Sequence, residues 1–399
     1  MISVTEALAI LSEHVPVMPT EMADLDDALG RLCAENILAR VTLPPRDASA
    51  MDGYAVRLED VRTSGVSLNV IGEVPAGSEF DATVGKGEAV RVFTGSPVPH
   101  GADHIIIQEN VVRNGASVKV LTSSHARQHI RRAGLDFAKG DVIIPYLTRF
   151  GPAETALAAA GNHSDVLVSK KPQISILAAG DELVRPGAAS SNGDVVNSNT
   201  SSLAALIKSW GGTALDVGLT KDDPRAIKAM FERAKTADIL LPVGGASVGD
   251  HDHMRRVFKK IGGEIIFEKI AVKPGKPTWF GVLDGKPVLG LPGNPASALV
   301  CAHLFLCCLM GRPPAAVVKM RLEGGLPENG PRETYLRARA SSRAGQLYVQ
   351  PFPRQDSSLL TPFRDANVLL RRLPNADPAT ETDLVDVIEL GSGPSAMGE

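Results

Sequence analysis

The spacing of apolar positions divides the chain into segments of different character. Over residues 1–45 apolar side chains recur at helical spacing, and a second helical stretch starts at Pro152 and stops at Gly161. The positions that share a helix face in the first stretch are Leu8, Leu11 and Val15 and, on another face, Leu25, Leu29 and Leu32. Residues 1–45 and 140–170 are therefore predicted to form a helical linking domain.

Between these stretches, residues 46–139 carry short alternating apolar runs separated by Gly, Pro, Asn and Ser. Such alternation is typical of strands that bury one face. The runs lie at 67–71, 89–93, 104–108 and 117–121. This segment is predicted to be a β-rich inserted domain.

From residue 171 to 314, strand-like runs alternate with helical ones at the spacing of βαβ units. Strands are expected at 173–178, 213–218, 238–243 and 287–291, and helices at 199–210, 224–235, 253–260 and 296–310. The pattern predicts a central α/β domain of three layers with a mostly parallel sheet. Short runs return over 315–399 and predict a small C-terminal β domain, so the expected fold class is multidomain α/β plus β.

Composition narrows the possible partners. Lys and Arg number 42 against 45 Asp and Glu, a balance that does not fit a protein binding nucleic acid through a basic surface. The most apolar run, 299–310, is shorter than the roughly 20 residues that cross a bilayer. The amino terminus lacks a secretory pattern, and the four cysteines lack disulfide or metal-site spacing. We therefore expect a cytoplasmic protein with no nucleic-acid and no membrane partner.

Glycines and carboxylates gather where the expected strands end. The loops after the first, third and fourth predicted strands are 179–183, 244–252 and 292–297. Ligands of an open α/β sheet bind beyond the carboxyl ends of its strands, so these loops are expected to share one site. Three lysines flank Pro274-Gly275 nearby, namely Lys269, Lys273 and Lys276. Glycine, acid and lysine together indicate a phosphorylated ligand with Mg²⁺.

Each feature also has a structural interpretation. Gly244-Gly245 alone can be a tight turn, Asp222-Asp223-Pro224 a helix cap, and the run 269–276 a charged guard on an edge strand. The convergence of three glycine-rich loops favours the phosphate site. Asp52 has no evident capping role because Gly53 interrupts a helix, so a ligand-directed role is the hypothesis there. Motifs of P-loop proteins, serine hydrolases and zincins do not occur in the sequence.

Several longer motifs follow one another in a recognisable order. They are Ser49-Ala50-Met51-Asp52-Gly53-Tyr54-Ala55-Val56, Arg91-Val92-Phe93-Thr94-Gly95, Gly180-Asp181-Glu182-Leu183, Gly244-Gly245 with Ser247 and Gly249, Lys273-Pro274-Gly275-Lys276-Pro277 and Gly290-Leu291-Pro292-Gly293-Asn294-Pro295. In this order they resemble the molybdopterin molybdenumtransferase family, which includes the E domain of gephyrin. The resemblance runs from the first helical stretch to about residue 314 and is weaker in the C-terminal segment.

The resemblance implies the last step of molybdenum cofactor synthesis. Molybdenum from molybdate would be inserted into adenylylated molybdopterin, AMP would be released, and Mg²⁺ would be required. Segment 171–314 would be the molybdopterin-binding domain. A homodimer with an active cleft shared between subunits is implied, as are transient contacts with a molybdopterin-adenylylating protein and with molybdoenzyme chaperones.

The resemblance also assigns roles by position. Catalytic roles fall on Asp52, Thr94, Glu182, Asp222 and Asp252, of which Glu182, Asp222 and Asp252 would hold the metal. Substrate-binding roles fall on Arg131, Asp136, Gly244, Gly245, Ser247, Lys269, Lys273, Lys276, Pro292, Pro295, Arg337 and Ser357.

Two other functions stay open from the sequence. The α/β domain could only bind or adenylylate molybdopterin, or cleave another nucleotide pyrophosphate, although such a domain alone would not need Asp52 or Thr94. A non-enzymatic scaffold resembling gephyrin is the second alternative, and the lack of a long linker or fused partner domain argues against it.

Overall fold

The computed structural model describes residues 1–78, 80–188, 191, 193–244 and 253–391. The chain forms two compact units, Thr20–Ser169 and Met1–Pro19 with Lys170–Glu399. Each unit has apolar clusters of its own, so each has an independent core. In the described part of the chain, no helix combines the length and apolar character that a membrane span requires.

A mixed sheet forms the centre of the larger unit, with the order β16-β13-β17-β21-β20-β18. Its strands are β13 (Gln173–Ala179), β16 (Thr213–Thr220), β17 (Ile239–Val243), β18 (Glu264–Phe267), β20 (Trp279–Leu283) and β21 (Lys286–Gly290). The strands from β16 to β21 in this order are parallel, whereas β20 is antiparallel to both β21 and β18. The mostly parallel sheet is confirmed, and β18 and β20 are additions that the βαβ pattern did not predict because no helix separates them.

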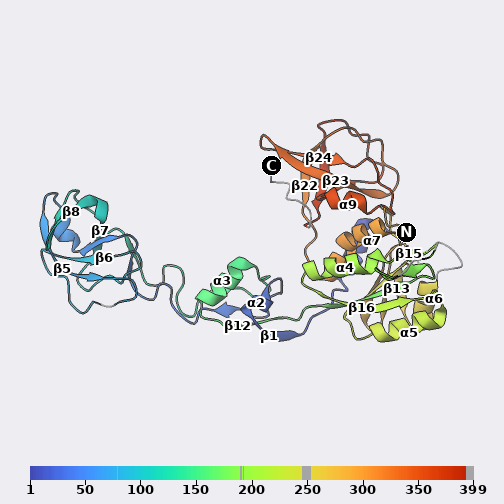
Figure 1. Cartoon of the computed structure of the whole chain (residues 1–399), viewed down its shortest axis with the longest axis horizontal. Helices are drawn as coiled ribbons and strands as arrows, with labels where there is room; N and C mark the ends of the chain where they lie inside the picture. Colours follow the sequence, from blue (N-terminus) through green and yellow to red (C-terminus); the bar gives the residue numbers. More distant parts are fainter. Residues whose placement is uncertain (79, 189–190, 192, 245–252, 392–399) are drawn as a thin grey trace. The chain divides into compact units, whose positions relative to one another are not determined.

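Helices cover both faces of this sheet, as Figure 1 shows for α4 and α7 on one side and α5 and α6 on the other. The helices of the α/β region are α1 (Val4–Ser12), α4 (Ser198–Ser209), α5 (Pro224–Ala234), α6 (His253–Lys260) and α7 (Pro295–Cys301). The three-layer expectation is confirmed. Helix α1 was expected in the linking domain, but its buried Val4 and Leu11 belong to the same apolar cluster as Ile174 of β13.

The helix expected over 296–310 is interrupted. After α7 the chain forms a π-helical turn, Ala302–Leu306, and then a short helix, α8 (Cys307–Leu309). A π turn inserts an extra residue per turn and shifts the apolar face, which hydrophobic spacing alone does not reveal.

The C-terminal region of this unit is a closed β structure. Strand pairing runs β23-β24-β22-β26-β25 and returns from β25 to β23, and β19 joins β23 at the outside. The elements are β19 (Val272–Lys273), β22 (Val317–Leu322), β23 (Glu333–Arg343), β24 (Gln346–Pro351), α9 (Thr361–Asp365), β25 (Val368–Arg372) and β26 (Leu384–Glu389). The predicted C-terminal β domain is thus a small barrel. Closure leaves its strands without free edges.

The smaller unit begins and ends in a segment of mixed structure. Its elements are β1 (Thr20–Asp24), α2 (Leu25–Ala28), β2 (Ile37–Leu38), β11 (Val142–Ile144), α3 (Pro152–Ala160) and β12 (Asp165–Ser169). The helix at 152–160 is confirmed. The second helical face, expected through Leu32, is wrong beyond one turn because Gly30 adopts a φ of 78° and β1 pairs with β12.

The β-rich insert contains a sheet with the order β7-β4-β6-β5-β9-β8. Its strands are β4 (Gly53–Val56), β5 (Ser67–Val74), β6 (Glu88–Val92), β7 (His104–Ile107), β8 (Val111–Asn114) and β9 (Ser117–Val120), beside a pair formed by β3 (Ala48–Ser49) and β10 (Ile130–Arg131). The four predicted runs correspond to β5, β6, β7 and β9. The segment around Asp52 lies directly before β4, inside this domain.

Candidate functional site

The carboxyl ends of neighbouring parallel strands bring acidic loops together. The Asp222 backbone N–H donates to Asp181 Oδ1 at 3.3 Å, and the Gly180 N–H donates to Thr220 O at 3.1 Å. These contacts join the loop after β13 to the loop after β16. In such sheets ligands bind beyond the carboxyl ends of the strands, and these two loops lie at that edge beside the point between β13 and β17 where the strand order reverses.

A second pair of loops meets on the other side of β13. Gly244 ends β17 with a φ of 85°, and a Cβ on Gly293 would lie 3.4 Å from Gly244 Cα. Asn199 in the first turn of α4 donates through Nδ2 to Gly293 O at 2.7 Å. The positive φ favours glycine at position 244, and a Cβ at position 293 would be in ordinary van der Waals contact with the Gly244 backbone. The predicted site residues Gly245, Ser247 and Asp252 lie outside the described residues.

Two of the three predicted metal ligands, Glu182 and Asp222, lie among the described residues. Glu182 is exposed and Asp222 is partly buried on adjacent loops. Within the described ranges, no group of three His, Cys, Asp or Glu side chains is arranged to hold a metal ion. Asp223 next to them is a helix cap, because its carboxylate accepts from the N–H groups of Arg225 and Ala226.

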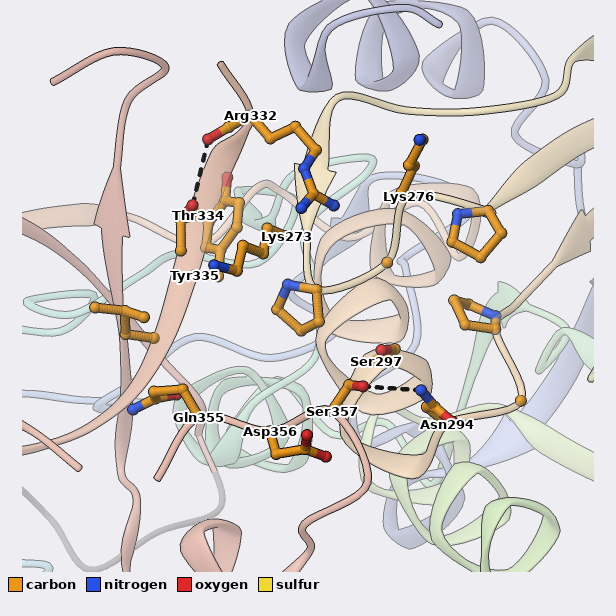
Figure 2. A pocket seen from close by; sticks show the side chains of 16 residues that line it. Lys273, Lys276, Asn294, Ser297, Arg332, Thr334, Tyr335, Gln355, Asp356 and Ser357 are labelled. Carbon is orange, nitrogen blue, oxygen red and sulfur yellow. Dashed lines mark hydrogen bonds between the residues drawn. The ribbon is translucent and has the colours of Figure 1, made fainter. Parts of the chain in front are cut away.

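A cavity of about 680 Å³ opens between the α/β region and the C-terminal barrel of the same unit. Four predicted substrate-binding residues line it: Lys273, Lys276, Pro292 and Ser357. Asn294 and Ser297, from the loop predicted at 292–297, also line it. Figure 2 shows Lys273, Lys276 and Ser357 beside polar residues that the sequence did not single out: Arg332, Thr334, Tyr335, Gln355 and Asp356.

Strand pairing places the lysines at the cavity. Strand β19 continues the C-terminal barrel, with Val272 opposite Glu333 and Lys273 opposite Thr334 of β23. The chain is therefore already paired with the barrel at Lys273, where the Lys273–Lys276 loop begins. Both lysines are exposed. Arg332, directly before β23, adds a third cation to this wall.

The opposite wall is a loop, 355–358, that ties the two parts of the unit together. Ser357 Oγ accepts from Asn294 Nδ2 at 2.8 Å, drawn as a dashed line in Figure 2, and Ser357 O accepts from the Ala296 N–H at 3.0 Å. Asn294 and Ala296 flank Pro295, the first residue of α7. Ser357 thus has structural partners in addition to its position at the cavity.

Arg337 holds this loop from beneath. Its side chain is 1% exposed and its guanidinium donates to Gln355 Oε1 at 3.2 Å, Asp356 O at 3.1 Å and Leu359 O at 3.0 Å. Burial lowers the pKa of the guanidinium. Arg337 is absent from the cavity lining, so its geometry is that of a residue acting through the loop.

Other polar groups at the cavity have fixed partners. The Tyr335 hydroxyl donates to Glu333 Oε1 at 2.7 Å, and burial together with this carboxylate raises the pKa of the phenol. The Asp356 carboxylate accepts from the side chain and backbone of Ser358, which lowers its pKa. Asp356 therefore stays ionised against Lys273, Lys276 and Arg332. Three cations against one carboxylate fit an oxyanion ligand.

The remaining predicted residues do not line this cavity. Lys269 O accepts from the Ile2 N–H, Arg131 lies in β10, and the Asp136 N–H donates to Leu43 O. Asp52 and Thr94 meet in the smaller unit, where Asp52 Oδ1 accepts from Thr94 N at 2.7 Å and Thr94 Oγ1 at 2.9 Å. These bonds lower the pKa of Asp52. Asp52 precedes a strand, β4, and not a helix, so its partner is not a helix terminus but Thr94, which is remote in sequence.

Three family models match successive regions that together make up most of the chain. Residues 2–161 match the MoeA N-terminal region (domain I and II), residues 175–312 match a probable molybdopterin binding domain, and residues 319–390 match the MoeA C-terminal region (domain IV).

Curated relatives match over most of their length. A molybdopterin molybdenumtransferase from Nostoc sp. is 35% identical over 356 residues, which cover 84% of this chain and 81% of the relative. One from Haemophilus influenzae is 33% identical over 384 residues, which cover 93% and 94%.

Solved structures agree with the fold. A molybdopterin biosynthesis moeA protein from Pyrococcus horikoshii OT3 is 29% identical with a TM-score of 0.83, covering 98% of this chain and 100% of its own. A molybdenum cofactor biosynthesis protein from Pyrococcus furiosus, 18% identical with a TM-score of 0.60 and covering 98% and 99%, shares the fold.

Proposed function

This chain belongs to the molybdopterin molybdenumtransferase family, and we propose that it inserts molybdenum from molybdate into adenylylated molybdopterin with release of AMP. The observation that carries the proposal is the cavity with Lys273, Lys276 and Arg332 on one wall and the 355–358 loop on the other. Cationic side chains and hydroxyl donors are suitable hosts for molybdate and for a phosphate group.

The acidic loops after β13 and β16 support a nucleotide end of the same substrate. Mg²⁺ usually binds proteins through one or two carboxylates and completes its coordination with phosphate oxygens and water. The carboxylates of Glu182 and Asp222 fit that donor set, and Asp252 would join them. When bound, Mg²⁺ would neutralise charge on the pyrophosphate.

The chain's own residues then act by placing charge. Cleavage of a phosphoanhydride depends mainly on positioning and on stabilising developing negative charge, so a nucleophilic side chain is not required. Lys273 and Lys276 would hold the oxyanion, while Asp52 and Thr94 would serve the insertion step. We further propose a cytoplasmic homodimer that contacts a molybdopterin-adenylylating protein and molybdoenzyme chaperones.

The test is AMP release from adenylylated molybdopterin by the purified chain, with and without molybdate and with Mg²⁺ or EDTA. We expect release that needs Mg²⁺ and is coupled to molybdenum insertion, and we expect Asp222→Asn to lose it. Adenylylation of molybdopterin from ATP would favour the adenylylating alternative. Cleavage of other dinucleotides at the same rate would favour a general pyrophosphatase.

A further inference from the structure

Two buried side chains lie directly beneath the Lys273–Lys276 loop, and the proposed reaction assigns neither of them a role. Thr278 and Cys301 are each 0% exposed. Thr278 donates to Gly275 O twice, from Oγ1 at 2.7 Å and from its backbone N–H at 3.0 Å. Cys301, at the end of α7, places Sγ 3.2 Å from Thr278 Oγ1. The loop between the two lysines therefore rests on a hydroxyl and a thiol.

Contact with the thiol is close at one backbone position. Gly275 has a φ of 120°, and a Cβ at this residue would lie 2.2 Å from Cys301 Sγ. Sulfur thus fills the space that a side chain at Gly275 would take. The backbone cannot move toward the core without displacing Cys301, and movement away breaks the hydrogen bonds to Thr278.

The ends of the loop are fixed separately. Lys273 pairs with Thr334 through β19 and β23, and Lys276 O accepts from the Ile270 N–H at 3.1 Å. Gly275 lies between these two fixed ends. The distance between its backbone and the Cys301 side chain therefore determines the path of the chain between the two lysines. Both lysines line the cavity, whereas Thr278 and Cys301 do not.

We infer that Thr278 and Cys301 are positioning residues, which hold the two lysines at the spacing that the oxyanion site requires. The inference rests on the proposed function. The thiol has no redox or nucleophilic part in it. Burial raises the pKa of Cys301 to about 12, consistent with a packing and hydrogen-bonding group.

The experiment titrates sodium molybdate into the full chain by calorimetry and measures the unfolding free energy of each variant. Thr278→Val removes the hydroxyl at similar volume, and we expect it to weaken molybdate binding about tenfold. Thr278→Ser restores the hydroxyl and should bind within about twofold of wild type. Cys301→Ala should weaken binding, while Cys307→Ala removes a buried thiol six residues further along the chain and should not.

Three results separate the possibilities. Wild-type protein that does not bind molybdate would count against the proposed function itself. Wild-type binding together with unchanged affinity in Thr278→Val would overturn the inference alone. If Thr278→Val does not fold, Cys301→Ala takes its place, and equal losses of affinity in Cys301→Ala and Cys307→Ala would show general loosening of the core and overturn the inference as well.

Discussion

Buried charge at Arg337 shapes the cavity wall without reaching the cavity. A guanidinium that is removed from water keeps its charge only where acceptors replace the lost hydration. The acceptors here are Gln355 and the carbonyls of Asp356 and Leu359, all in the loop that carries Ser357. The loop is therefore folded around the guanidinium, and its position depends on that charge.

The chain contains a matched control for this residue. Arg372 on β25 is also buried, at 6% exposed, and also donates to backbone carbonyls, those of Pro327, Ala376 and Asp377. Both Arg337→Met and Arg372→Met should lower the unfolding free energy by about 1 to 3 kcal/mol. Only Arg337→Met should also weaken molybdate binding, by about tenfold. Calorimetry and urea unfolding of both variants check this, and equal affinities would contradict it.

Asp52 accepts two hydrogen bonds from Thr94, which give its carboxylate a structural role that needs no ligand. Whether its charge also serves the reaction requires a separate test. Asp52→Asn keeps the Oδ1 acceptor and removes the charge. If the charge serves molybdenum insertion, this variant should bind adenylylated molybdopterin but couple AMP release to molybdate about 10 to 100 times less well. The measurement is AMP release with and without molybdate.

A second hydrogen-bonded aspartate controls for disturbance of the domain. Asp103 accepts from the Leu58 N–H and from Arg127 in the same β-rich insert. Asp103→Asn should leave the coupling unchanged. Wild-type coupling in Asp52→Asn would leave Asp52 with its structural role alone.

At the scale of elements, the π turn at Ala302–Leu306 carries a pH-sensitive group. His303 in this turn lies edge-on to the Trp210 ring at 5.3 Å, and burial lowers its pKa to about 4. The folded state thus favours neutral imidazole, whereas the unfolded chain protonates near pH 6.5. The contribution of neutral His303 to stability is therefore fully present above pH 6.5 and is lost as the pH falls toward and through 4.

We expect His303→Phe to lose less stability than wild type over that interval, by roughly 1 to 2 kcal/mol. Both tryptophans, Trp210 and Trp279, belong to the larger unit, so their fluorescence in urea reports that unit alone. The difference between variant and wild type is measured at pH 7.5, 5.5 and 4.5. Parallel pH profiles would show that His303 does not contribute.

Sequence patterns predicted the elements whose periodicity is long and whose ends are marked. Helix α5 begins at Asp223-Pro224, a cap followed by proline, and the structure confirms both. Short strands were not predicted. The five residues of β1, for example, alternate over too short a stretch to be distinguished from a helix turn. Strand β1 is fixed by its pairing with β12, a segment far away in the chain.

Pairing between segments that are distant in the chain also limits what the sequence could predict about the site. Lys273, Lys276 and Pro292 lie in motifs with strong local constraints, and all three line the cavity, while their substrate-binding role stays a prediction. Arg332 and Asp356 lie in the C-terminal segment, where no motif marks them. Tertiary contacts bring them to the cavity: β19 pairs with β23 directly after Arg332, and the Arg337 guanidinium binds the backbone of Asp356. A cation directly before a strand was the only signal available for Arg332.

At the scale of the whole molecule, an exposed apolar face in the smaller unit supports the proposed homodimer. Leu38 and Val142 are paired across β2 and β11 and are 47% and 50% exposed, and Tyr146 and Leu147 nearby are each 57% exposed. A two-stranded sheet with apolar side chains in water is a suitable surface for a second copy of the chain.

Leu38→Glu combined with Val142→Glu should therefore shift the protein to monomers at micromolar concentration, because four charges would face one another across a symmetric interface. Sedimentation velocity measures the shift. Val112→Glu on β8 is the control, since Val112 is similarly exposed, at 46%, in the β-rich insert. We expect the monomeric variant to keep the wild-type unfolding midpoint of the larger unit and to lose molybdenum insertion. A double variant that remains dimeric would place the interface elsewhere, and a monomer with full activity would show that one chain suffices for the reaction.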